Sequence, residues 1–171
     1  MQTLQRMFAE RIGDAADRIS YVMSGGTEGI LSPHFTVISR SMDSAADAPE
    51  AARKALAVGV RHTRDFLPEE IGRMAQVEAV AQAVRSAMEE AGIERSEDVH
   101  CVQIKCPLLT TDAIHEAEER GARVVTEDTY KSRGYSRGAS ALGTAAALGE
   151  IDAAALSEAD ICSRWEKYSE V

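Results

Sequence analysis

The sequence predicts a fold that mixes helices and strands, of class α/β or α+β. From residue 54 onward, segments with strand-like alternation are followed by segments with helical spacing, in the order β-α-β-α-β-α. In addition, 44% of the 171 residues are hydrophobic, which is enough to bury a substantial core. The length fits one ordinary domain or parts of two.

The N-terminal part combines one predicted helix with two predicted strands. Residues 4–18 carry apolar side chains at mixed helical spacing and predict a short helix, interrupted at Gly13. Residues 19–23 predict a strand that delivers Ser24, and residues 34–40 predict a second strand, opened by a proline. A polar, alanine-rich stretch with no strong period then follows. We interpret residues 43–53 within it as a linker that marks a domain boundary.

The clearest helix of the sequence comes after a predicted strand over residues 54–64. Pro68, followed by two glutamates, is typical of a first helical turn, and Gly92 is typical of a helix end. Between them, apolar residues recur every three or four positions: Ile71, Met74, Val77, Ala81, Val84 and Met88.

The rest of the chain predicts two further strands and up to three helices. In chain order they are a strand over 99–105, a helix from Thr110 or Thr111 to Arg120, a strand over 123–126, a polar loop over 127–135, a small-residue helix over 139–148 and the start of a helix over 157–165.

Composition excludes several classes of function. The formal net charge is −9 with no basic cluster, so a nucleic-acid partner is not expected. No stretch approaches the roughly 18 consecutive apolar residues of a membrane span, and no secretory signal is visible. The three cysteines, Cys101, Cys106 and Cys162, are an odd number that favours reduced thiols and a cytoplasmic setting. The four histidines are scattered, so no metal site is predicted.

The most distinctive motif is the run Ser24-Gly-Gly-Thr-Glu-Gly29, which follows a predicted strand. Its glycines let the backbone approach a ligand closely. The motif therefore suits a reactive hydroxyl beside backbone N–H donors, an anion cradle, or a turn with no chemical role. It lacks the Gly-Lys-Ser/Thr of a phosphate-binding loop and the pattern of a hydrolase nucleophile elbow.

Three further residues have a chemical and a structural interpretation. Lys105 ends a predicted strand, where it could be a base for a serine hydroxyl or simply be solvated. Arg137 lies in a basic, glycine-containing stretch before a predicted helix; it could bind a planar, carbonyl-rich ligand or belong to a solvated loop. Glu28 could orient a lysine or cap a turn.

Three motifs carry a resemblance to a known family. Residues 24–35 (SGGTEGILSPHF), residues 102–110 (VQIKCPLLT) and residues 136–143 (SRGASALG), which lead into 147–150 (ALGE), resemble segments of the ring-opening amidohydrolases, the cyanuric acid hydrolase and barbiturase family. The resemblance covers most of the chain.

The resemblance implies an α+β architecture of three similar repeats around a pseudo-threefold axis, each a β-sheet covered by helices. It implies hydrolytic opening of a cyclic imide, cyanuric acid to carboxybiuret and biuret, by a serine nucleophile and a lysine base, within s-triazine degradation. By motif, Lys105 and Ser24 are the catalytic residues, and Ser24, Gly25 and Arg137 bind the substrate. The chemistry requires no cofactor.

The chain also departs from the family pattern. Residues 1–42 correspond to the C-terminal part of a first repeat and residues 54–171 to a second repeat that is incomplete at its C-terminal end, while a third repeat, with any structural metal, is absent. We therefore expect a fragment or split subunit, inactive unless a homo-oligomer (a tetramer in the family) or a complementing chain supplies the rest. Barbituric acid as substrate, and a non-catalytic binding or assembly module, are the alternatives.

Overall fold

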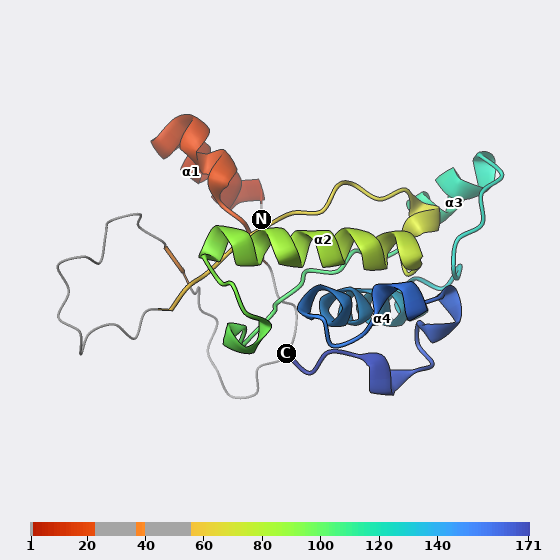
Figure 1. The fold of residues 1–171 in the computed structure, drawn as a ribbon. Coiled ribbons are helices and arrows are strands. Elements are labelled where there is room, and N and C mark those ends of the chain that lie inside the picture. The colour runs from red at the N-terminus through yellow and green to blue at the C-terminus, as the bar shows by residue number, and fades with distance from the viewer. Residues whose placement is uncertain (1, 23–36, 40–55) are drawn as a thin grey trace, which may run out of the picture. The chain divides into compact units, whose positions relative to one another are not determined.

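The computed structural model describes residues 2–22, 37–39 and 56–171 (Figure 1). The chain divides into two compact units, residues 1–54 and residues 55–171. Each unit is described by itself below. Ser24, Gly25 and Glu28 lie outside the described residues.

The first unit contains helix α1 (Gln2–Ile12), followed by a 3₁₀ segment at Gly13–Arg18. The predicted helix and its interruption are confirmed, because Gly13 has a φ of 55° that ends the regular α-helix. The predicted strand over 19–23 is wrong for residues 19–22, which form neither helix nor strand. Of the predicted strand over 34–40, only residues 37–39 are described, and they are not in a strand either.

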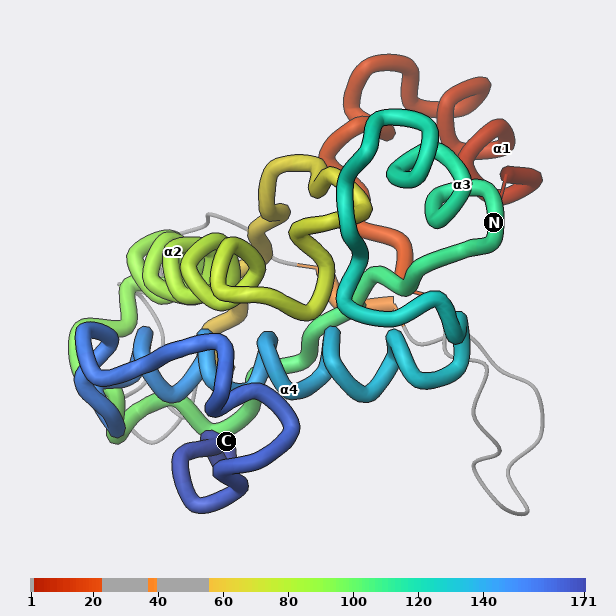
Figure 2. Tube along the Cα trace, turned by 90° about the vertical axis from the view of Figure 1, so that its right-hand side faces the viewer, coloured from red at the N-terminus to blue at the C-terminus, as the bar shows by residue number. Residues whose placement is uncertain are grey.

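The second unit is built on helices α2 (Met74–Ala91) and α4 (Thr129–Leu148), which pack against each other. Figure 1 shows α2 along its length, and α4 is seen along its length only in the rotated view of Figure 2, so the two helices cross. Gly143 makes the crossing close: a Cβ atom at this position would lie 2.6 Å from the Val77 carbonyl oxygen and 2.9 Å from Val80 Cβ.

The hydrophobic core of this unit forms three clusters around the two helices. Their buried members are Val77, Ala139, Leu142 and Ile161; Ile71, Leu109 and Ile114; and Val80, Val84 and Leu148. Most of the predicted apolar stripe of α2 therefore contributes to the core, as its helical spacing indicated.

Both ends of α2 show how glycine shapes this region. Pro68–Glu70 forms a single 3₁₀ turn, and α2 begins only at Met74, because Gly72 adopts a φ of 74°. The predicted stop at Gly92 is confirmed, since this residue is left-handed and its N–H bonds back to the last turn of the helix.

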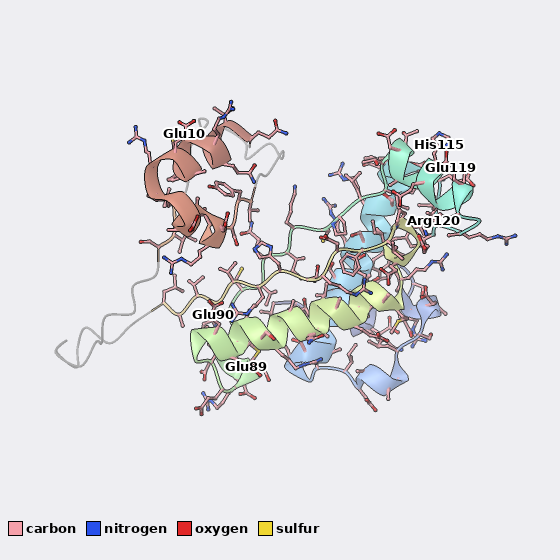
Figure 3. The ribbon with its side chains drawn as sticks, turned by 90° about the horizontal axis from the view of Figure 1, so that it is seen from above. Glu10, Glu89, Glu90, His115, Glu119 and Arg120 are labelled. Carbon is pink, nitrogen blue, oxygen red and sulfur yellow. The ribbon has the colours of Figure 1, made fainter. Side chains whose placement is uncertain are left out.

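Helix α3 (Thr111–Glu119) also matches its prediction, because Thr110 Oγ1 accepts a hydrogen bond from Ala113 N at 3.2 Å as an N-cap. The guanidinium of Arg120 donates to both carboxylate oxygens of Glu69, at 2.7 and 2.8 Å. This pair ties the C-terminal end of α3 to the turn that precedes α2. Figure 3 shows α3, with His115, Glu119 and Arg120, away from the end of α2 that carries Glu89 and Glu90.

The predicted sheet is wrong: the part of the chain that the structure describes contains no strand. Alternating side chains favour an extended backbone, but a sheet also needs backbone partners. The segment 56–67 instead contacts α2, where Val60 N donates to Glu90 Oε2 at 2.8 Å. Gly59 lies so close to α2 that an added Cβ would be 1.8 Å from the Ala87 carbonyl oxygen. The described fold is thus helical rather than α+β, and the sheet-based repeat is not present in it.

Two boundaries in the C-terminal part also differ from prediction. Helix α4 begins at Thr129 instead of near residue 139, because Asp128 Oδ1 caps it by accepting from Tyr130 N at 2.9 Å and Lys131 N at 3.0 Å. The predicted helix over 157–165 is replaced by short 3₁₀ turns, at Glu158–Asp160 and Trp165–Lys167.

Candidate functional site

Arg137 and the segment that carries Lys105 meet at one hollow of the second unit. The hollow has a volume of about 160 Å³, and Arg137, Ser140 and Thr144 of α4 form one wall. Ile104 and Cys106, from the segment before α3, also line it. The structure therefore brings together two stretches of chain that are more than thirty residues apart in the sequence.

Lys105 stands between two residues that line this hollow, and it is itself exposed. Its neighbours Ile104 and Cys106 turn toward α4 and are half-buried. The structure thus places the Lys105 backbone at the rim of the hollow. Ser24 and Gly25, the other two predicted site residues, cannot be placed because they lie outside the described part.

Arg137 lies in the middle of a helix, and the prediction of a glycine loop is wrong. The preceding Ser136 is no helix cap but a buried residue, whose hydroxyl accepts from Gln76 Nε2 at 2.9 Å. Among the described contacts, the neighbouring Lys131 pairs with Asp128 and Arg133 stacks on Tyr130, at 5.6 Å from the ring centroid.

Arg137 differs from these two basic neighbours. Its side chain is exposed, lines the hollow, and makes no ion pair or hydrogen bond among the residues that the structure describes. Its guanidinium is therefore available to a ligand with carbonyl or anionic oxygens.

The C-terminal end of the chain fixes the region beside Arg137. Tyr168 Oη accepts a hydrogen bond from Cys162 N at 2.7 Å, and both side chains pack against Gly138. A Cβ atom on Gly138 would lie 2.6 Å from Tyr168 Oη, so a larger residue here would displace the tyrosine hydroxyl. Burial raises the pKa of the Cys162 thiol, which keeps it protonated and makes a nucleophilic role there unfavourable.

Sequence reasoning missed a row of buried hydroxyl groups along α4. Ser132, Ser136, Ser140 and Thr144 recur every four residues, and all four are buried. This spacing places them on one face of a helix. The signal was present in the sequence, but it has this meaning only once the helix is known to begin before residue 132.

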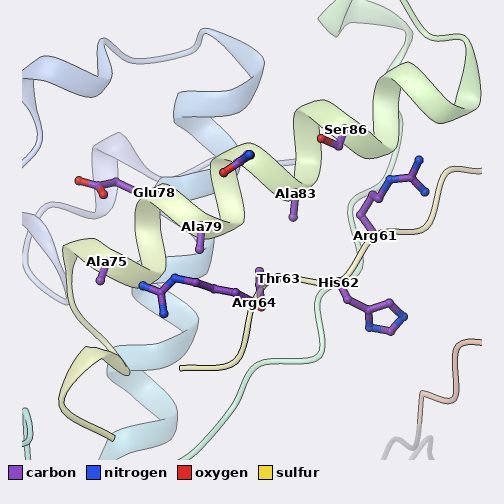
Figure 4. A pocket seen from close by; sticks show the side chains of 10 residues that line it. Arg61, His62, Thr63, Arg64, Ala75, Glu78, Ala79, Ala83 and Ser86 are labelled. Carbon is purple, nitrogen blue, oxygen red and sulfur yellow. The ribbon is translucent and has the colours of Figure 1, made fainter. Parts of the chain in front are cut away.

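A second, larger hollow of about 390 Å³ lies between residues 61–64 and α2 (Figure 4). Its two arginines already have carboxylate partners: Arg61 pairs with Glu90 at 2.7 Å, and Arg64 pairs with Glu70 at 2.6 Å. Figure 4 shows the Arg64 side chain extended along the helix, while the ring of His62 points away from it. The facing side of α2 contributes three alanines and three polar residues, Glu78, Gln82 and Ser86. Of the predicted site residues that the structure describes, none lines this hollow.

The described residues contain neither a metal-binding cluster nor a membrane-spanning helix. No group of three or more histidine, cysteine, aspartate or glutamate side chains is arranged there to hold a metal ion. None of the helices in that part is both long enough and apolar enough to cross a membrane.

Comparison with known proteins gives one consistent result. The family model described as "Amidohydrolase ring-opening protein (Amido_AtzD_TrzD)" matches residues 1–171. The cyanuric acid amidohydrolase of Azorhizobium caulinodans is 56% identical over 169 residues, which are 99% of this chain and 46% of the relative. The cyanuric acid amidohydrolase of Enterobacter cloacae is 52% identical over 168 residues, which are 96% of this chain and 45% of the relative.

Solved structures agree with the sequence comparison. The crystal structure of a cyanuric acid hydrolase from A. caulinodans superposes with a TM-score of 0.88 at 54% identity, covering 98% of this chain and 46% of that chain. The chain thus spans about half the length of the relatives it matches. On the strength of the family match along its whole length, the chain belongs to the ring-opening amidohydrolases.

Proposed function

We propose that this chain contributes part of the active site of an enzyme that opens the ring of cyanuric acid by hydrolysis. The observation that carries the proposal is the meeting of Arg137 with the Lys105 segment at one hollow. The names of the relatives support the substrate, and the shared sequence covers both of these residues. The chain spans about half the length of each relative. We propose that groups outside these 171 residues, from the same polypeptide, a second copy or a complementing chain, complete the active site, and that the enzyme works in the cytoplasm.

In the proposed reaction, Lys105 is the base that accepts the proton of a serine hydroxyl, whose oxygen attacks a ring carbonyl carbon. The C–N bond of the ring then breaks and the ring nitrogen receives the proton from Lys105. Water hydrolyses the resulting ester, which restores the serine and releases the opened product, carboxybiuret. Ser24 and the N–H of Gly25 donate hydrogen bonds to a ring carbonyl, and Arg137 donates to another.

The first experiment combines intact mass and subunit composition of the purified protein with an assay of cyanuric acid hydrolysis on the same sample. Barbituric acid, in which one ring N–H is replaced by CH₂, is tested in parallel. Turnover of cyanuric acid supports the proposal, and preferential turnover of barbituric acid would replace its substrate. A lone chain that neither binds nor hydrolyses either ring would instead indicate a non-catalytic module.

Two substitutions test the assigned roles in the active assembly. Lys105→Ala should lower kcat by about 10²–10⁴-fold, the usual contribution of a general base, with a modest change in substrate binding. Arg137→Ala should weaken binding as well as turnover, because it removes a donor to the substrate. Arg133→Ala is the matched control, since Arg133 lies one turn earlier on α4 and stacks on Tyr130. Near-normal kinetics of the Lys105 or Arg137 variant would contradict its role.

A further inference from the structure

One buried amide side chain links the turn before α2 to α4, the helix that lines the hollow at Arg137. Gln76 of α2 has no exposed surface. Its Oε1 accepts from Gly72 N at 2.7 Å, in the turn before α2. Its Nε2 lies 2.9 Å from Ser136 Oγ, 3.1 Å from the Ser136 carbonyl oxygen and 3.1 Å from Ser140 Oγ, all on α4. An amide NH₂ has two protons, so these three acceptors share them.

The same network reaches the segment that carries Lys105. Ser140 Oγ, which Gln76 contacts, also accepts from Cys106 Sγ at 3.4 Å. Cys106 is the residue next to Lys105, and it lines the hollow together with Ser140 and Arg137. The chain of contacts Gln76–Ser140–Cys106 therefore runs from α2, through α4, to the backbone beside Lys105.

Gln76 also acts on the helix position next to Arg137. It bonds both the hydroxyl and the carbonyl group of Ser136, the residue directly before Arg137. Rotation or sliding of α4 against α2 would break these bonds. A buried amide without partners is unfavourable, so the network favours one register of the two helices over its neighbours.

We propose that Gln76 is a positioning residue, which fixes the Lys105 segment and the Arg137 helix relative to each other through Ser136, Ser140 and Cys106. The inference deepens the proposed function and rests on it for the roles of Lys105 and Arg137. Whether Gln76 restrains the Lys105 segment can be measured without an assay of cyanuric acid hydrolysis.

The experiment compares three variants of the 171-residue chain. Gln76→Met keeps the length of the side chain but removes its hydrogen bonds, and Ser140→Ala removes only the hydroxyl that joins Gln76 to Cys106. Val77→Ala is the matched control, because Val77 is buried on the same helix in the cluster with Ala139 and Leu142, which does not include the 99–106 segment. Should Gln76→Met fail to fold, Ser140→Ala still tests the link.

The readout is the rate at which iodoacetamide labels Cys106, followed by peptide mass spectrometry with exposed Cys101 as the internal reference. Gln76→Met and Ser140→Ala should raise the Cys106 rate about fivefold, as expected when one ordinary hydrogen bond no longer opposes local opening. Val77→Ala should lower Tm but leave the Cys106 labelling rate unchanged. An unchanged rate in both network variants, or an equal rise in the control, would overturn the inference.

Cyanuric acid turnover, measured on the same samples, separates this inference from the proposed function. If the unmutated protein hydrolyses cyanuric acid, the network variants should lose at least about tenfold in kcat/KM, mostly through KM, while Val77→Ala should not. Faster labelling with unchanged kcat/KM would refute the positioning role. If the unmutated assembly shows no turnover, the proposed function fails, and the labelling rates alone decide whether Gln76 holds the segment.

Discussion

At the scale of single residues, Asp160 shows how one carboxylate fixes the C-terminal turns. It is buried, and it accepts hydrogen bonds from Lys167 Nζ at 2.6 Å and from the N–H and hydroxyl of Ser157 at 2.8 and 3.0 Å. The hydrogen bond from Lys167, followed by that from the Ser157 backbone, lowers the pKa of Asp160 to about 2. The turns that it holds include Cys162, which packs beside Arg137 at Gly138.

This pKa predicts a dependence of stability on pH. The folded-state pKa of Asp160 lies below the ordinary value of about 3.9, so its stabilisation is present above pH 4 and is lost as the pH falls toward 2. Asp160→Asn should therefore lower Tm at pH 7 and flatten the decline of Tm between pH 4 and pH 2. Circular dichroism melts over this range measure both effects. The same substitution at exposed Asp65 is the control, and an equal change there would contradict the prediction.

The pKa of Glu69, in the turn before α2, is also lowered by hydrogen bonds from a basic side chain. The hydrogen bonds from Arg120 lower the pKa of Glu69 to about 2, which favours the ionised pair at neutral pH. Because the pair is partly exposed, it orients α3 more than it stabilises the molecule.

At the scale of elements, the crossing of α2 and α4 depends on one glycine. Gly143→Ala should destabilise the protein by about 1–3 kcal/mol, because the new methyl group meets the Val77 carbonyl oxygen, which is backbone and cannot move aside easily. Gly134→Ala, on the same helix, has open space around the added Cβ and should instead stabilise by about 0.5–1 kcal/mol. Urea melts of the two variants give the comparison. Equal effects of the two substitutions would mean that the helices do not approach closely at Gly143.

The elements that sequence reasoning predicted correctly are those whose signals are local. The stripe of α2, its stop at Gly92 and the Thr110 cap of α3 depend on residues within a few positions of each other. The start of α4 was missed because Ser132, Gly134 and Ser136 are typical of loops, although Asp128 caps a helix there. Tertiary contacts decide this case: the hydroxyls of Ser132 and Ser136 accept hydrogen bonds from Leu109 N and Gln76, which tie this stretch of the helix to its neighbours.

The predicted strands are wrong for a different reason. Alternation over 99–105 describes which side chains share a face, but it contains no information on whether a neighbouring backbone is present. In the described residues, Cys106 bonds a helix side chain and Val60 N bonds Glu90. The sequence therefore indicated an exposed and a buried side of these segments, but not their partners.

At the scale of the whole molecule, the candidate site was predicted only in part. Arg137 and the neighbours of Lys105 line one hollow, while Ser24 and Gly25 lie outside the described residues; the roles of all four residues stay predictions. The contribution of Gln76 could not be predicted, because it lies far from both residues in the sequence and depends on how α2 crosses α4. Long-range contacts of this kind follow from packing and not from a motif.

The division into two units gives the last prediction. The three clusters of buried apolar side chains found in the described residues all lie within 55–171. A protein made of residues 55–171 alone should therefore unfold cooperatively, with a Tm within a few degrees of the whole chain, because it retains the crossing of α2 and α4. Differential scanning calorimetry of both proteins tests this, and a broad transition without a heat-capacity peak would show that residues 1–54 are needed for the fold.

The same shortened protein also tests the first-unit part of the proposed site. It lacks Ser24 and Gly25 but keeps Lys105 and Arg137, so in an otherwise active assembly it should fold and lose cyanuric acid turnover. Ser24→Ala in the whole chain is the matched control, because it removes the hydroxyl alone and should lower kcat without changing Tm. Full activity of both proteins would contradict a role for Ser24 and Gly25. Of the predicted site residues in this chain, Lys105 and Arg137 would then remain.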